Sequence, residues 1–102
     1  MDRDGEPERE AALPRAKDEM DRAERELQTS AGDCATACRA LGSMDRAARH
    51  LCDLAGNDDE LDRCEEAKRK VLRARDRVRA TCGICAGGPT VDRNAPVPST
   101  SP

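Results

Sequence analysis

The sequence predicts an all-α domain, in which an antiparallel helical hairpin is stapled by disulfides and carries an additional helix on its N-terminal side. Two observations support this fold class. Apolar residues recur at spacings of three and four, which is the period of an amphipathic helix. The 102 residues also hold six cysteines and no aromatic side chain. A chain of this length forms one small domain at most, and its termini are expected to be flexible.

The chain contains too few large apolar side chains to stabilise a hydrophobic core without further support. One Ile, seven Leu and four Val make up about 12% of the chain, which is below the roughly 20% under which disorder is usually suspected. Small scaffolds with so few core residues need covalent or metal staples. The six cysteines are the candidates for that role.

Residues 1–12 are expected to form a flexible leader, because they are charged and contain Gly and Pro. The first helix is predicted from Pro14, which suits a first turn, to about Thr29. Its apolar positions form one narrow stripe along the helix. The stripe consists of Leu13, Ala16, Met20, Ala23 and Leu27. It is expected to pack on the hairpin or to detach and receive a protein partner.

The second helix is predicted to begin after Asp33, which is a good N-cap, and to run to about Ala55. Gly56 is expected to end it as a left-handed C-cap. The short connection that follows forces the next helix to run antiparallel. Together these elements define the hairpin, and the Cys-rich three-helix domain is expected to span residues 13–85.

The third helix is predicted from about Asp58 to Thr81. Asn57 and Glu60 have the layout of a capping box at its start. Acidic residues gather in its first half and basic residues in its second half, an order that complements the helix macrodipole. The chain after residue 85 is rich in Pro, Ser, Thr and Gly, so residues 86–102 are expected to form a disordered tail.

All six cysteines fall on the facing seams of the second and third helices when positions are counted in steps of three and four. Residues at the same height of an antiparallel hairpin have a nearly constant sum of residue numbers. That rule predicts a ladder with the rungs Cys52–Cys64, Cys38–Cys82 and Cys34–Cys85. A crossed version, with Cys34–Cys82 and Cys38–Cys85, remains open. Each rung can add about 2–4 kcal/mol by restricting the unfolded chain.

The same rule makes two predictions for charged side chains. It places Asp45 opposite Arg75, as an interhelical salt bridge worth about 0–1 kcal/mol if exposed. It also places His50 near Lys68 or Lys70, where a charged imidazole is disfavoured.

A metal site and a redox site are the alternatives to structural disulfides. Four thiolates at the open end of the hairpin could hold zinc in an intracellular protein. The four ligands would be the thiolates of Cys34, Cys38, Cys82 and Cys85. Cys52 and Cys64 would then have no role at the metal. The weaker alternative is a thiol redox protein using Cys82 and Cys85, although a helix C-terminus disfavours a thiolate.

Several functional classes are not expected. The chain has 21 acids, 18 bases and a net charge of −3, and it has no aromatic side chain to stack on bases. This composition disfavours nucleic-acid binding. No segment has the length of a membrane span. A catalytic constellation is likewise missing from the pattern, so an enzyme is not expected. The composition therefore favours a structural or protein-interaction role without a cofactor.

The middle of the chain also resembles known sequences. The stretches 33–48, 51–56, 62–64 and 74–85 read DCATACRALGSMDRAA, LCDLAG, DRC and ARDRVRATCGIC. Over about residues 14–85 the chain resembles a group of small uncharacterised cysteine-rich helical proteins of myxobacteria and related GC-rich bacteria. The resemblance implies an exported protein, secreted or lipoprotein-like, with no established activity.

The expected location is periplasmic, envelope-associated or extracellular, because disulfides persist in oxidising compartments. No apolar run follows a basic start after Met1, so no signal peptide is visible. The relatives implied by the resemblance tend to carry an export signal. A cytoplasmic location, where thiols stay reduced, is therefore the alternative.

Overall fold

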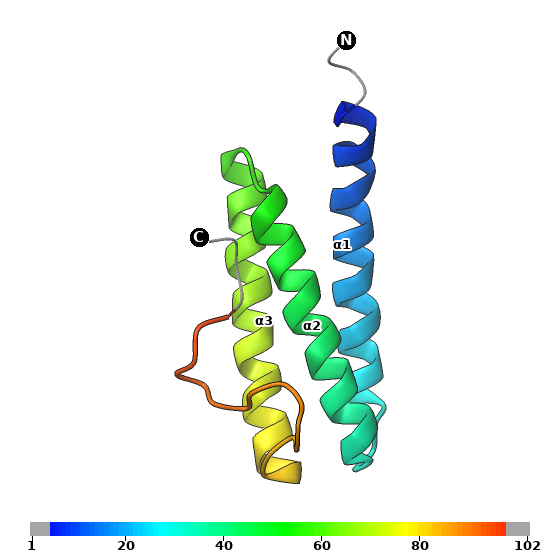
Figure 1. The fold of residues 1–102 in the computed structure, drawn as a ribbon, viewed down its shortest axis with the longest axis vertical. Coiled ribbons are helices and arrows are strands. Elements are labelled where there is room, and N and C mark those ends of the chain that lie inside the picture. The colour runs from blue at the N-terminus through cyan, green and yellow to red at the C-terminus, as the bar shows by residue number, and fades with distance from the viewer. Residues whose placement is uncertain (1–4, 98–102) are drawn as a thin grey trace.

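The fold is a set of three long helices. The computed structural model describes the backbone of residues 5–97 and the side chains of residues 12–97. The helices are α1 (Gly5–Gln28), α2 (Cys34–Leu54) and α3 (Asp58–Cys82), drawn in Figure 1. Every regular element within the described backbone is a helix, so the predicted all-α class is confirmed.

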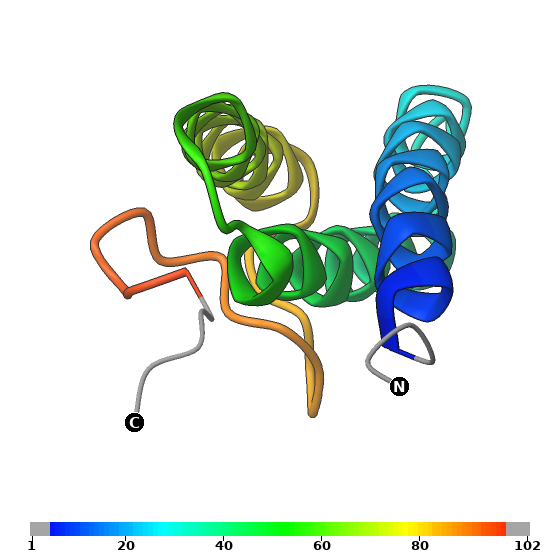
Figure 2. The same ribbon diagram turned by 90° about the horizontal axis from the view of Figure 1, so that it is seen from above.

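α2 is the central element of the molecule. α1 and α3 both pack along it and touch each other at few points. Viewed from above, the three helices form an angle with α2 at the corner (Figure 2). Much of the core is alanine, which allows the helix axes to approach closely. The core alanines are Ala16, Ala23, Ala37, Ala40, Ala47, Ala48, Ala67 and Ala74.

The predicted starts of the second and third helices are confirmed. The Asp33 carboxylate accepts hydrogen bonds from the Thr36 backbone N–H at 3.2 Å and the Thr36 hydroxyl at 2.9 Å. At α3, the Asn57 side-chain oxygen accepts from the Glu60 N–H at 2.9 Å. The Glu60 carboxylate in turn accepts from the Gly56 N–H at 2.7 Å. This capping box therefore reaches one residue further back than its usual form.

The predicted left-handed cap at Gly56 is wrong. α2 ends at Leu54, and its C-cap is Ala55, which is extended at φ −67° and ψ 120°. The Ala55 N–H donates to the Cys52 carbonyl at 3.4 Å. Gly56, between extended Ala55 and the Asn57 cap, is not at positive φ, so the turn forms without a left-handed residue. A positive-φ cap occurs instead at Gly83, with φ of 83° and ψ of −76°, where it ends α3.

The first helix starts earlier than predicted. α1 begins at Gly5, so the expected leader is helical over residues 5–12, and Pro14 lies inside the helix. Residues 1–4 lie outside the described part. A proline removes one hydrogen bond from the preceding turn. Pro14 is exposed, so water can solvate the carbonyl that loses its partner, and the helix continues through this position.

The predicted disordered tail is wrong for the residues that the structure describes. Residues 83–97, named the strap here, double back from the end of α3 (Figure 1). Val91 is buried and Val97 is partly buried against the core. Sequence composition missed this packing because a covalent tether and a buried arginine hold the strap, and neither depends on the strap's own hydrophobicity. Residues 98–102 lie outside the described part.

Candidate functional site

Three disulfides fix the hairpin and the strap. Cys52–Cys64 joins α2 to α3 near the turn, with 4.7 Å between the Cα atoms, as predicted. At the open end the pairs are Cys34–Cys82 and Cys38–Cys85, with Cα separations of 5.8 and 5.7 Å. These separations are ordinary for disulfides.

The predicted rungs Cys38–Cys82 and Cys34–Cys85 are therefore wrong, and the crossed version is the one observed. The counting rule assumes that the helix continues through Cys85. In the structure α3 ends at Cys82, and Gly83 redirects the chain at positive φ. The chain then turns back along α2, so that Cys85 meets Cys38, one helical turn inside α2, rather than Cys34 at its start.

In this pairing, neither the predicted zinc site nor the predicted redox pair has a free thiol. All six cysteines are in disulfides, so the four proposed zinc ligands offer no thiolate. Among the described residues, no group of three or more His, Cys, Asp or Glu side chains is arranged to hold a metal ion. Cys82 and Cys85 bond to different partners on α2 rather than to each other.

The predicted pair between Asp45 and Arg75 is present, and it is buried. The Arg75 Nη2 atom lies 3.9 Å from Asp45 Oδ1, and the Arg75 side chain is fully inaccessible to solvent. Arg75 also donates hydrogen bonds to the strap, which the sequence did not predict. The acceptors are the carbonyl oxygens of Asp92 at 3.1 Å, Ala95 at 2.6 Å and Pro96 at 3.3 Å.

The two helices alone do not provide a hydrogen-bond partner for every polar atom of Asp45 and Arg75. Burial raises the pKa of Asp45, and the neighbouring Arg75 and Arg46 charges oppose that rise. Asp45 Oδ1 and Arg75 Nε have no hydrogen-bond partner. A buried ion pair with orphaned atoms is costly and contributes little net stability. The strap carbonyls therefore supply the hydrogen bonds that make burial of Arg75 tolerable.

The observed partner of His50 is on α1, which the sequence prediction did not include. The Nδ1 atom of His50 is 3.3 Å from a Glu19 carboxylate oxygen on α1. Lys70 also faces α1, with its Nζ 3.4 Å from Glu24 Oε1. The counting rule treated the hairpin as two helices alone, whereas α1 packs beside α2 and brings acids to both side chains.

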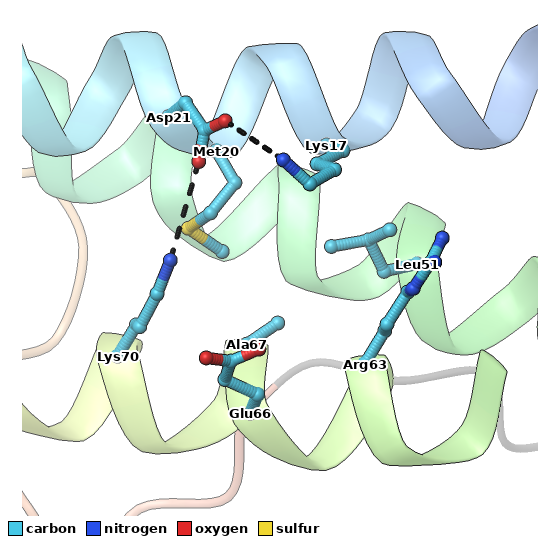
Figure 3. A pocket seen from close by; sticks show the side chains of 8 residues that line it. All are labelled: Lys17, Met20, Asp21, Leu51, Arg63, Glu66, Ala67 and Lys70. Carbon is cyan, nitrogen blue, oxygen red and sulfur yellow. Dashed lines mark hydrogen bonds and ion pairs between the residues drawn. The ribbon is translucent and has the colours of Figure 1, made fainter. Parts of the chain in front are cut away.

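A groove of about 220 Å³ runs between α1 and α3 over the floor formed by α2. Met20, Leu51 and Ala67 supply its apolar atoms, and charged side chains of both signs line its walls (Figure 3). Those side chains are Lys17, Asp21, Arg63, Glu66 and Lys70. Asp21 takes ion pairs from Lys17 at 3.3 Å and from Lys70 at 4.0 Å, as Figure 3 shows. The first of these pairs lies within α1, and the second joins α3 to α1.

The predicted partner stripe on the first helix is docked in this structure. Ala16, Met20, Ala23 and Leu27 are all buried.

None of the described helices has the length and hydropathy needed to cross a membrane. Comparison of the chain with protein-family models, curated proteins and solved structures finds no match. The function must therefore be argued from the molecule's own residues.

Proposed function

We propose that this chain is a non-catalytic, disulfide-stapled helical module of the cell envelope or extracellular space, with a structural or protein-interaction role. The observation that carries the proposal is the use of all six cysteines in three disulfides within one small helical domain. Disulfides of this density persist in oxidising compartments and are typical of small exported domains. The resemblance of residues 14–85 to exported cysteine-rich helical proteins supports the same location.

A non-catalytic role is supported by the use that the fold makes of its unusual side chains. The buried Arg75 holds backbone carbonyls, and Asp45 is its counter-charge. The exposed imidazole of His50 pairs with a surface glutamate. Each of these groups is engaged in packing or surface pairing, and none is presented with a nucleophile at a cavity, as acid–base or covalent catalysis requires.

The proposal is tested by intact mass measurement of the protein purified from its native compartment without reductant. We expect a mass lower than the sequence mass by six hydrogens, and no alkylation until the protein is denatured and reduced. A protein whose thiols are alkylated at once, or that carries a metal released by a chelator, contradicts the proposal. Control protein reduced before alkylation takes up six labels and shows that the reagent reaches all cysteines.

A further inference from the structure

The chain is tied to α2 on both sides of the turn that ends α3. Cys34–Cys82 holds the last residue of α3, and Cys38–Cys85 holds the strap three residues later. The two partner cysteines on α2 are four residues apart, so they lie one helical turn from each other. Only two residues separate the two bonds at the end of α3. This turn, at the open end of the hairpin (Figure 1), therefore has little freedom to move.

The turn presents one large apolar side chain to solvent. Gly83 has φ of 83° and ψ of −76°, and the Ile84 N–H donates to the Cys82 carbonyl at 3.1 Å. These values are those of the rarer γ-turn, a strained conformation that glycine adopts most readily. Ile84 is 73% exposed, compared with 50% for Leu61, the other large apolar residue that is exposed in the described part of the chain. Ile84 is thus an apolar projection that is held in a fixed place.

An open hollow of about 590 Å³ lies beside Ile84, between the end of α3 and the strap. Pro89 and Val91 of the strap supply apolar atoms to its lining. Arg79 of α3 and Asp92 of the strap supply charges of opposite sign. The volume is in the range of protein pockets that take a ligand, and it exceeds what one aliphatic side chain fills.

The projection and the hollow lie side by side, which makes this surface complementary to itself. In a dimer with two-fold symmetry, each contact across the interface occurs twice, once in each direction. Ile84 of each copy can therefore enter the hollow of the other, where Val91 lies. Arg79 of each copy then faces the partner's Asp92. Burial of the apolar groups favours association, and the opposite charges fix how the two copies align.

We propose that this end of the molecule binds a second copy of the chain, in a two-fold symmetric dimer in which Ile84 of each copy fills the hollow of the other. Because the two disulfides already hold the projection in place, little conformational entropy is lost on association. The surface is confined to one turn and the strap, so the dimer is weak and depends on concentration. The proposal rests on the oxidised module described under Proposed function, since both disulfides fix the turn.

The test follows Ile84 directly, because it is the only isoleucine of the chain. Selective ¹³C labelling of its δ1 methyl group gives a single NMR signal. We expect this signal to shift as the full oxidised chain is concentrated from about 10 μM to about 1 mM. Sedimentation equilibrium over the same range should show a mass that rises toward twice that of the monomer. A chain that stays monomeric, with an unchanged Ile84 signal, overturns the proposal.

The Ile84→Ser variant removes the projection. We expect its dimer dissociation constant to rise about hundredfold, because loss of an interface anchor costs about tenfold and the contact occurs twice. The matched control is Leu61→Ser, which removes an exposed apolar side chain from the first half of α3, and its dissociation constant should stay within about twofold of the parent. An unchanged constant in Ile84→Ser, or an equal loss in both variants, overturns the proposal. Far-ultraviolet circular dichroism checks that both variants retain their helices.

Alkylation of the same sample before the measurement separates this proposal from the one on which it rests. An oxidised chain that takes up no label and remains monomeric contradicts the dimer alone. Thiols that are already free before reduction contradict the oxidised module itself.

Discussion

α3 and α1 pack on the same central helix and are held there by different means. α3 is joined to α2 by two disulfides, one near each end of the hairpin. α1 contains no cysteine and depends on its apolar stripe and surface ion pairs. The difference shows how a chain with few large apolar side chains divides its stability. Disulfides reinforce the α2–α3 hairpin, in which α3 also buries Val71 and Val78, whereas α1 is attached by noncovalent contacts alone.

The largest expected effect follows from removing the covalent bonds. Three disulfides at about 2–4 kcal/mol each approach the whole stability of a typical small domain, about 5–15 kcal/mol. We therefore expect full reduction to unfold the chain or lower its melting temperature steeply, as followed by far-ultraviolet circular dichroism with and without a phosphine reductant. An unchanged helical melt after complete reduction, verified by alkylation, contradicts the comparison.

The second effect separates α1 from the hairpin. Met20 is 2% exposed on the α1 stripe, and truncation of a buried methionine costs about 2–5 kcal/mol. Met20→Ala should therefore release α1 while the stapled hairpin keeps its fold. Hydrogen exchange is expected to lose protection in α1 and to retain it in α2 and α3.

Leu61→Ala is the control for this variant, because Leu61 is 50% exposed on α3. Its effect on the free energy of unfolding should stay within about 0.5 kcal/mol. If Met20→Ala lowers protection equally in all three helices, the molecule is one cooperative unit and the division between regions is wrong.

A smaller effect is expected at the turn of the hairpin. Asn57 caps α3 through its hydrogen bond to the Glu60 N–H, and loss of such a cap costs about 1 kcal/mol. Asn57→Ala should lower the denaturant midpoint modestly and increase exchange in the first turn of α3. Asn57→Asp keeps an acceptor at the same place and should restore the midpoint. A midpoint that the aspartate does not restore would show that the cap acts through something other than this bond.

The smallest effect concerns pH and the buried charge between α2 and α3. Burial raises the pKa of Asp45 above its ordinary value, so the folded protein binds a proton more readily than the unfolded chain. The contribution of this carboxyl to stability therefore improves as pH falls through its folded pKa and worsens as pH rises. The stability of the parent chain relative to Asp45→Asn should increase on acidification, measured by urea unfolding at several pH values. Parallel curves contradict the direction of the shift.

Sequence reasoning located the helices of the hairpin well and the path of the chain after them poorly. The periodicity of apolar residues, the Asp33 cap and the Asn57–Glu60 pair are local signals, and the structure confirms each of them. The turn bond Cys52–Cys64 spans a short loop, so counting along two ideal helices was enough to find it. The salt bridge between Asp45 and Arg75 was found by the same count, although not its burial.

The sequence by itself thus determined the helical class, the N-caps of α2 and α3 and the turn disulfide, because each depends on neighbours in the chain or on composition. The tertiary structure decided the pairing of the other four cysteines, the packed strap and the burial of Arg75. The pairing and the packed strap depend on the positive-φ turn at Gly83, which redirects the chain away from the helix axis, and the strap in turn supplies the carbonyls that bind Arg75. The path of the chain after Gly83 is fixed by contacts with residues that are distant in the sequence, and no local sequence pattern indicates these contacts.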